Sequence, residues 1–283
     1  MARIIAIANH KGGVGKTTTV AAIGAALAAK GLNTLLVDLD SQANLTSSLF
    51  KGEPEETIYT ALKGKSSVPT IKIRDGLSLT PSTLDMAGVE LELSSTIQRE
   101  FILKDLLEPI QGRYDYILLD CPPSLGLIVV NALVAADEVM IPLTAEALPF
   151  KGLVKLTDII TMVGKRLNPS LRLSGIIITR WERGRLSQNV EAALRRHYGG
   201  LVFNTKIRKN VSVAEAPLSG KDLLSYAPNS NGAADYKTLT EEITENSNTN
   251  NMGNTDNMGN MSNNKHTKNT LTDFESDGDE GLK

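Results

Sequence analysis

The stretch Ile7–Val20, "IANHKGGVGKTTTV", contains the motif on which the fold prediction depends. It includes Gly15-Lys16-Thr17, the end of the phosphate-binding loop G-x-x-x-x-G-K-[ST], but has His10 where the strict motif begins with glycine. A second lysine, Lys11, stands five positions before Lys16. An apolar run precedes the loop and an alanine-rich run with helical spacing follows it. The stretch therefore predicts a strand, a glycine loop and a helix.

Further apolar, strand-like runs alternate with helical stretches along the chain. The strand-like runs are "NTLLVDLD", "GLSLTPS", "YDYILLDCPPS", "ADEVMIPLT" and "LRLSGIIITR", and the helical ones include "REFILKDLLEPI", "GLVKLTDIITMVGKRL" and "SQNVEAALRRHYG". This alternation predicts an α/β fold of the P-loop NTPase class, with a mainly parallel central sheet and helices on both faces. Because ligands bind beyond the carboxyl ends of such strands, we expect the loop, Asp38, Asp40 and Asp120 to meet at one edge.

Composition divides the chain into two regions. Residues 1–244 have the alternating strand and helix pattern of a folded nucleotide-binding domain, whereas residues 245–283 are rich in asparagine, contain a near-repeat of "NMGN" and end in acidic residues. The second region has too few apolar side chains to offset the entropy lost on ordering, so we predict that it is disordered. It is either a dispensable tail or a docking segment for a partner.

The 283-residue chain has one cysteine, Cys121, which rules out an internal disulfide and suits a reducing compartment. No apolar run approaches the ~20 residues needed to span a bilayer, and the apolar start lacks the basic region of a secretory leader. These features predict a cytoplasmic protein.

The glycine loop predicts a nucleotide site with Mg²⁺. Lys16 would reach the β- and γ-phosphates, and the Thr17 hydroxyl would bind Mg²⁺. Asp120 ends an apolar strand, where the second metal-supporting group of such a site belongs, although an aspartate there can also cap a turn. The loop residues expected to present backbone N–H groups to phosphate are Gly12, Gly13, Val14 and Gly15.

Three further charged residues have two interpretations each. Asp38 and Asp40 flank Leu39 at a strand end, so alternation places both on one face. One or both could orient the attacking water, or they could be turn residues. Lys11 is either a solvated loop residue or an additional cation that stabilises the transferred phosphoryl group, at its own site or at a neighbour's.

The segments "KGGVGKTTT", "LLVDLDSQANLT", "YDYILLDCPPSLGL" and "VSVAEAP" occur in this order between Ala2 and Ile243. Together they resemble the ParA/Soj family of deviant Walker-type ATPases, in the small form that lacks an N-terminal helix-turn-helix domain. The resemblance implies ATP hydrolysis with Mg²⁺ by a homodimer that sandwiches the nucleotides. This chain departs from the family pattern in having serine, where proline is usual, after Asp40.

The resemblance also implies roles for single residues. Lys11 would be the signature lysine that reaches the partner's nucleotide. Asp40 would polarise the attacking water, and Asp120 would be the Walker B acid. Thr18 would contact phosphate, and Asn210 would contact the adenine. The residues expected to act in catalysis are Lys11, Lys16 and Asp40.

Charge is concentrated in one segment. Residues 165–221 contain twelve Lys/Arg against three Glu, a net charge of +9, in a chain whose net charge is −2. Such a segment suggests a polyanionic partner, and its residues could neutralise phosphates without reading bases. The resemblance implies non-specific binding of double-stranded DNA, with "RWERGRLSQ" in the contacting region. The candidate DNA contacts are Arg183 and Arg185, followed by Arg180, Arg195, Arg196 and Lys209. Alternatively, the segment is a solvated face whose bases pair with acids.

The resemblance thus implies an ATPase that drives partition of a plasmid, chromosome or mobile element. ATP would close the dimer, the dimer would bind the nucleoid, and a ParB-like partner would stimulate its weak ATPase activity. The alternative is a nucleotide-switched scaffold or regulator that positions a cargo other than DNA. A metabolic enzyme of the same fold would need a second substrate pocket. A membrane-bound relative of the MinD type is disfavoured because the end, "TLTDFESDGDEGLK", is acidic.

Overall fold

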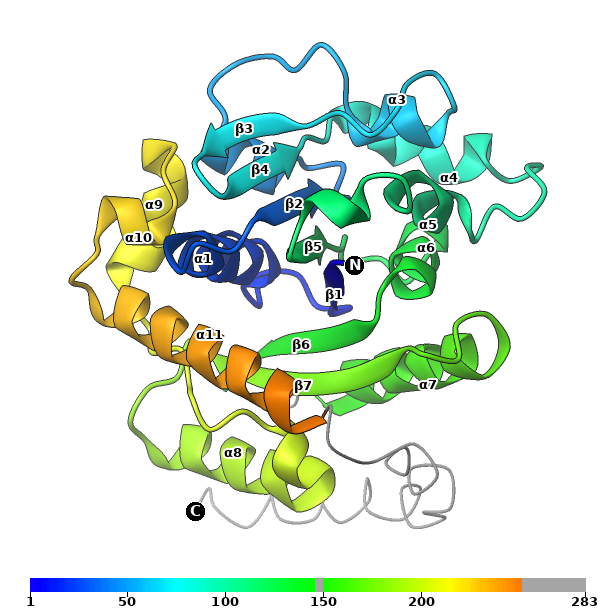
Figure 1. Cartoon of the computed structure of the whole chain (residues 1–283). Helices are drawn as coiled ribbons and strands as arrows, with labels where there is room; N and C mark the ends of the chain where they lie inside the picture. Colours follow the sequence, from blue (N-terminus) through cyan, green and yellow to red (C-terminus); the bar gives the residue numbers. More distant parts are fainter. Residues whose placement is uncertain (146–149, 251–283) are drawn as a thin grey trace. The chain divides into compact units, whose positions relative to one another are not determined.

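A computed structural model describes residues 1–145 and 150–250 of the chain. Within these residues the centre is a seven-stranded sheet in the order β3-β4-β2-β5-β1-β6-β7 (Figure 1). Neighbouring strands are parallel except for β3 and β4, which are antiparallel. This confirms the predicted α/β fold with a mainly parallel sheet. The strands are β1 (Arg3–Ile7), β2 (Thr34–Asp38), β3 (Ile71–Arg74), β4 (Leu77–Thr80), β5 (Tyr116–Asp120), β6 (Glu138–Thr144) and β7 (Arg172–Thr179).

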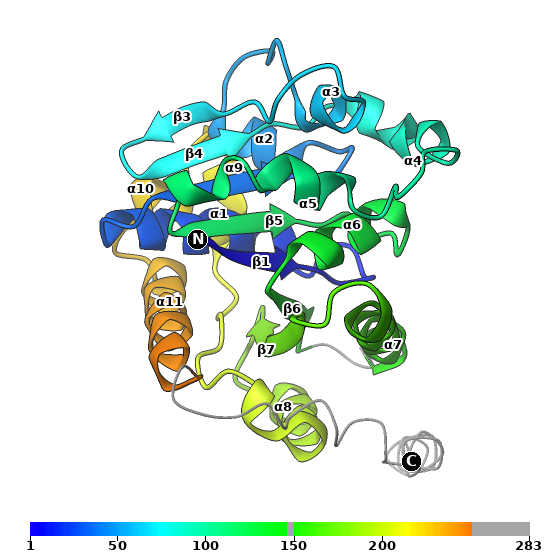
Figure 2. The same ribbon diagram turned by 45° about the vertical axis from the view of Figure 1, so that its right-hand side comes forward.

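Helices cover both faces of the sheet, with α1, α9 and α10 on one face and α5, α6 and α7 on the other (Figure 2). The α-helices are α1 (Lys16–Ala29), α2 (Asn44–Leu49), α3 (Ile58–Leu62), α4 (Val89–Glu92), α5 (Ile102–Leu107), α6 (Leu127–Ala135), α7 (Phe150–Arg166), α8 (Arg185–Tyr198), α9 (Val211–Ser219), α10 (Leu223–Tyr226) and α11 (Asn231–Asn250). Short 3₁₀ turns are η1 (Leu84–Gly88), η2 (Gln111–Arg113) and η3 (Gly199–Leu201).

The central strands are apolar along their length because helices bury both of their faces. Every residue of β2, β5 and β6 is buried. The buried acidic residues of these strands include Glu138, at the start of β6, which accepts hydrogen bonds from Arg3 on β1 and Arg172 on β7. This cluster links three adjacent strands at the end of the sheet opposite the glycine loop.

The antiparallel strand β3 was not among the predicted strands. It forms a hairpin with β4 through Asp75 and Gly76, and Gly76 adopts φ +73°. Aspartate followed by glycine is a strong signal for a tight hairpin turn, and "IKIR" before it has the alternation of a half-buried strand. Because β3 lies at the edge of the sheet, its polar residues face solvent and weaken the apolar signal.

Residues Met1–Glu242 form one structural unit. Helix α11 extends to Asn250, beyond the predicted domain boundary at residue 244. The remainder of the predicted tail, residues 251–283, lies outside the described part of the chain.

Candidate nucleotide-binding site

The glycine loop connects β1 to α1 in a shape that requires glycine at two positions. Gly13 and Gly15 have φ values of +73° and +89°, a backbone conformation that is unfavourable for residues with a Cβ. A Cβ built on Gly12 or Gly13 would meet no atom within 4 Å, so this part of the loop faces open space. Gly15 precedes α1 without a capping side chain, which leaves backbone N–H groups of the first helical turn available to an anion.

Lys16 is the first residue of α1 and is only 7% exposed. Its Nζ lies 3.5 Å from the Lys11 carbonyl oxygen, a long contact that leaves the ammonium only weakly satisfied. Burial lowers the pKa of Lys16, while the negative charge of Asp120 opposes the shift. A buried cation beside open backbone N–H groups is suited to bind phosphate.

Asp120 ends β5 and pairs in register with Asp38 of β2. It is 1% exposed, and neither carboxylate oxygen has a hydrogen-bond partner among the described residues. Burial and the charge of Asp38 raise its pKa, whereas the Thr17 hydroxyl and the Lys16 ammonium lower it. An unpartnered buried carboxylate beside a threonine hydroxyl fits Mg²⁺, which prefers oxygen ligands.

No group of three or more His, Cys, Asp or Glu side chains that could hold a metal occurs in the described residues. A site formed by Asp120 and Thr17 agrees with this finding, because Mg²⁺ is usually held by one or two protein groups, with substrate phosphates and water completing its coordination.

The two aspartates at the end of β2 have different environments, Asp38 as the last residue of the strand and Asp40 two residues beyond it. Asp38 is fully buried and accepts hydrogen bonds from the backbone N–H (2.9 Å) and hydroxyl (2.7 Å) of Thr46 on α2. Burial raises the pKa of Asp38 to about 6. Asp40 lies beyond the strand, is partly exposed, and accepts a hydrogen bond from the backbone N–H of Gln42 (3.0 Å). Asp38 therefore fixes the loop, and Asp40 is the carboxylate with access to the site edge.

Two polar residues that the sequence analysis overlooked hold the glycine loop. Asn9 is buried after β1 and accepts a hydrogen bond from the Lys11 N–H (3.0 Å). Thr179, the last residue of β7, has its hydroxyl 2.8 Å from the Val14 carbonyl oxygen. Thr179 ends β7 and Asn9 lies two residues beyond β1, so the sequence places both at the loop edge, but their partners depend on the folded topology. Lys11 itself is exposed.

Thr18 lies half-buried in the first turn of α1, next to Thr17. Asn210 is the N-cap of α9, where its side chain accepts a hydrogen bond from the Ser212 N–H (2.9 Å). Helix α9 packs against α2, which follows the loop containing Asp40. Asn210 thus stands at the start of a helix that borders the Asp40 loop, and its predicted contact with adenine stays a prediction.

The basic segment 165–221 is partly neutralised by ion pairs. Within the described residues, at least five of its bases pair with carboxylates: Arg172, Arg195, Lys206, Arg208 and Lys209. Arg195 also donates to the carbonyls of Val202 and Phe203, so it holds the residues after η3 against α8. Arg183, Arg185 and Arg196 are exposed and form no ion pair within the described residues.

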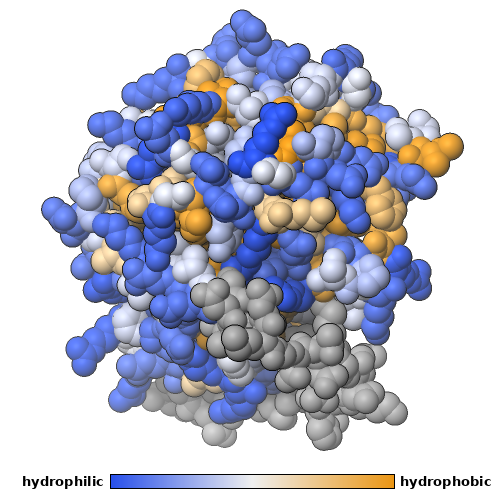
Figure 3. Space-filling view, viewed as in Figure 1, coloured by the Kyte–Doolittle hydropathy of each residue, from blue (hydrophilic) through white to orange (hydrophobic). Residues whose placement is uncertain are grey.

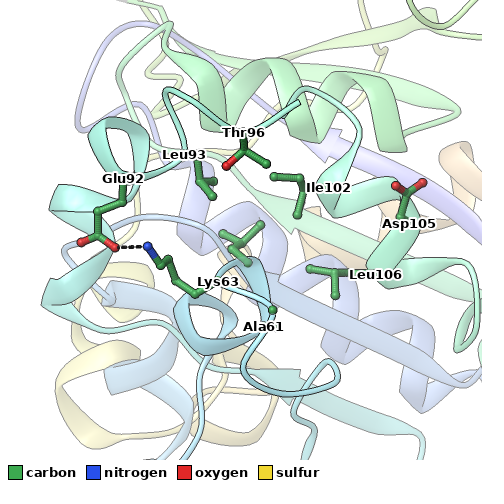
Figure 4. A pocket seen from close by; sticks show the side chains of 10 residues that line it. Ala61, Lys63, Glu92, Leu93, Thr96, Ile102, Asp105 and Leu106 are labelled. Carbon is green, nitrogen blue, oxygen red and sulfur yellow. Dashed lines mark ion pairs between the residues drawn. The ribbon is translucent and has the colours of Figure 1, made fainter. Parts of the chain in front are cut away.

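A separate hollow of about 440 Å³ lies between α3, α4 and α5 (Figure 4). Leu93, Ile102 and Leu106 line it, and an ion pair of 2.7 Å joins Lys63 to Glu92 at its side. None of the predicted nucleotide-site residues lines this pocket.

Three large apolar side chains of the segment 84–97, part of which lines this hollow, are exposed. Leu84, Leu91 and Ile97 are 72%, 81% and 88% exposed. Figure 3 shows a hydrophobic patch at the upper right, over the region of α4, on an otherwise mostly hydrophilic face. None of the helices in the described part of the chain is long and apolar enough to cross a membrane.

Comparisons with known proteins match most of the chain. The family model described as AAA domain matches residues 2–173. The sporulation initiation inhibitor protein Soj of Bacillus subtilis is 42% identical over 252 residues, which cover 87% of this chain and 100% of that protein. The chromosome partitioning protein ParA of Caulobacter vibrioides is 41% identical over 249 residues, 85% of this chain and 93% of that protein.

A solved structure shares the fold and has an occupied nucleotide site. Cobyrinic acid a,c-diamide synthase from Mycobacterium smegmatis, with a bound ATP analogue and magnesium, superposes with a TM-score of 0.77 at 33% identity, covering 86% of this chain and 95% of that one. ATP and Mg²⁺ are accordingly the cofactors of this chain. On these grounds the chain belongs to the ParA/Soj family of P-loop ATPases.

Proposed function

We propose that this ATPase is a nucleotide-switched partition protein. ATP closes a homodimer, the dimer binds DNA without sequence preference and so associates with the nucleoid, and a ParB-like partner stimulates hydrolysis and release. The cycle drives segregation of a plasmid, chromosome or mobile element. The names of the Soj and ParA relatives support this assignment.

The observation that carries the proposal is the position of the basic segment. Strand β7 ends at Thr179, whose hydroxyl contacts the glycine loop, and the chain continues at once through Arg180 to the exposed Arg183 and Arg185. The phosphate-binding loop and the basic segment are thus joined by one strand end. A basic surface of this kind binds phosphates through charge, with little sequence information.

The ion pairs of the structure provide a ranking of the candidate DNA contacts. Arg183, Arg185 and Arg196 are exposed without carboxylate partners in the described residues, so they are the first choices. Arg195 and Lys209 pair with Glu191 and Glu182, and each would have to exchange a carboxylate for a phosphate. Arg180 is exposed at the end of β7 and remains a candidate.

Within the ATPase site, Lys16 and the loop amides hold the phosphates, and Asp120 and Thr17 hold Mg²⁺, which neutralises phosphate charge when bound. Asp40 orients the attacking water from the partly exposed loop that Asp38 fixes. Lys11 reaches the partner subunit's nucleotide and makes hydrolysis depend on dimerisation. This role agrees with its exposed position at the start of the glycine loop.

The test of DNA binding compares two double variants that remove the same positive charge from different surfaces. The double variant Arg183→Ala/Arg185→Ala should weaken binding to every duplex. The slope of log K against log salt concentration should become less steep by roughly one unit for each phosphate that is no longer neutralised. The control, Lys104→Ala/Arg113→Ala, removes two exposed bases outside the basic segment and should bind like the unaltered protein. Equal weakening in both pairs, or a loss restricted to certain sequences, would refute the proposed surface.

The second candidate is a nucleotide-switched scaffold that positions a cargo other than DNA. The exposed Leu84, Leu91 and Ile97, which fall within one short segment of the sequence, favour it, because exposed apolar patches are typical of protein-binding sites. The two candidates differ in what is mislocalised when the gene is removed. If DNA copies are no longer distributed equally between daughter cells, the result supports the partition protein. Normal DNA segregation with a displaced protein cargo supports the scaffold.

A further inference from the structure

Two buried side chains attach the glycine loop to β6 and β7. Asn9 donates from its amide to the Pro142 carbonyl of β6 (2.6 Å) and accepts from the Lys11 N–H (3.0 Å). On the far side of the loop, the Thr179 hydroxyl lies 2.8 Å from the Val14 carbonyl and 3.1 Å from the Leu143 carbonyl of β6. The loop is therefore held at both of its ends.

These hydrogen bonds set the orientation of two peptide groups. The hydroxyl of Thr179 has one proton, and the shorter distance assigns it mainly to the Val14 carbonyl. Because a trans peptide is planar, fixing this carbonyl also fixes the direction of the Gly15 N–H. Asn9 fixes the Lys11 N–H in the same way, and with it the point from which the Lys11 side chain projects.

Both supporting residues are well buried, at 7% exposure for Asn9 and 3% for Thr179. Water is therefore a poor replacement for either side chain, and a loop carbonyl that loses its partner stays unsatisfied. The loop between them is rich in glycine and would lose much conformational entropy on ordering. Side chains that order it in advance remove that cost from nucleotide binding.

We propose that Thr179 and Asn9 are positioning residues of the ATPase, which hold the glycine loop in its phosphate-binding form before the nucleotide arrives. They act through the loop backbone and do not themselves touch the reacting atoms. The inference rests on the ATPase site alone and does not depend on DNA binding or dimerisation.

The test separates the hydroxyl of Thr179 from its methyl group. Thr179→Val keeps the volume and removes the hydroxyl, whereas Thr179→Ser keeps the hydroxyl. The matched control is Thr80→Val, since Thr80 is also a buried strand-end threonine but its hydroxyl has no hydrogen-bond partner among the described residues. Affinity for a fluorescent ATP analogue with Mg²⁺ is measured by titration, and amide hydrogen exchange of residues 8–20 is measured without nucleotide.

We expect Thr179→Val to bind the nucleotide about tenfold more weakly, from the loss of a buried hydrogen bond, and to exchange loop amides faster. Thr179→Ser should stay within about threefold of the unaltered protein, and Thr80→Val should match it. Equal loss in the Val and Ser variants would show that methyl packing matters and would overturn the proposal. So would unchanged affinity and exchange in Thr179→Val.

Asn9→Ala provides an independent test if Thr179→Val does not fold. It removes the bonds to Pro142 and Lys11, so it should also weaken nucleotide binding and speed exchange of the loop amides. An Asn9→Ala protein with the affinity and the exchange rates of the unaltered chain contradicts the proposal.

Discussion

Replacing Asp120 by asparagine should stabilise the nucleotide-free protein and abolish its stabilisation by Mg²⁺ and ATP. The carboxylate is 1% exposed and has no hydrogen-bond partner among the described residues. A buried ion in a protein costs several kcal/mol, and the Thr17 hydroxyl and the nearby Lys16 ammonium offset part of that cost. We therefore expect a gain of about 2 kcal/mol for the neutral variant without nucleotide.

For the unit Met1–Glu242, 2 kcal/mol corresponds to a rise in Tm of about 4–8 °C. Ligand at 1,000 times its Kd stabilises the unaltered protein by about 4 kcal/mol. This exceeds the gain from asparagine, so saturating Mg²⁺ and ATP should make the unaltered protein the more stable of the two. The order of the two Tm values thus reverses on adding the nucleotide.

The difference in stability should also depend on pH. Burial raises the pKa of Asp120 above its ordinary value of 3.8, so the folded state holds this proton more tightly than the unfolded state. The stability of the unaltered protein therefore falls as pH rises above that value, and the asparagine variant lacks this contribution. The gap in Tm should narrow as the pH is lowered towards 4.

Thermal unfolding with and without Mg²⁺ and ATP, and with ATP plus a chelator, measures these effects. The chelator should remove most of the stabilisation of the unaltered protein by ATP. An asparagine variant that is less stable without nucleotide would refute the electrostatic reasoning. One that Mg²⁺ and ATP stabilise as strongly as the unaltered protein would refute the assignment of Asp120 as the metal-supporting residue.

Two other predictions concern catalysis and stability. Lys16→Ala should abolish ATP binding, whereas Asp40→Ala should bind ATP and stall hydrolysis; equal loss of binding in both, measured by titration, contradicts this division. Although burial opposes it, the hydrogen bonds from Arg3 and Arg172 hold the pKa of Glu138 below its ordinary value of 4.5. That stabilisation exists above pH 4.5 and is lost as pH falls through the lowered pKa, so Glu138→Gln should cost about 3 kcal/mol at pH 7 and much less at pH 3. Urea unfolding at both pH values checks this, and an equal cost at both would exclude the ion pairs as the cause.

The sequence contains enough local information to predict the sheet and the position of the nucleotide site. Buried parallel strands give continuous apolar runs, and the motif at Lys16 places a glycine loop at a strand end. The hairpin through Asp75 and Gly76 had a local signal that the apolar pattern obscured, because β3 is an edge strand with polar residues facing solvent.

Other features depend on contacts between distant segments and have no local signal. Asp38 turns inward because Thr46, on the following helix, supplies two donors. Thr179 reaches a loop 165 residues earlier in the chain because β7 and β1 flank β6. Arg208 is neutralised by Asp235, which lies on α11. Strand-end and charge patterns in the sequence identify such residues as candidates, but their partners depend on the folded topology.

In the proposed function, the nucleotide at the glycine loop controls DNA binding by the basic segment 165–221. The most direct test is binding to an arbitrary DNA duplex at several salt concentrations, with ATP and Mg²⁺, with ADP and Mg²⁺, and without nucleotide. We predict tight binding only with ATP and Mg²⁺, and we predict that this binding weakens steeply as the salt concentration rises. Binding that is absent, or equal under all three conditions, would contradict the claim and favour the scaffold for a protein cargo.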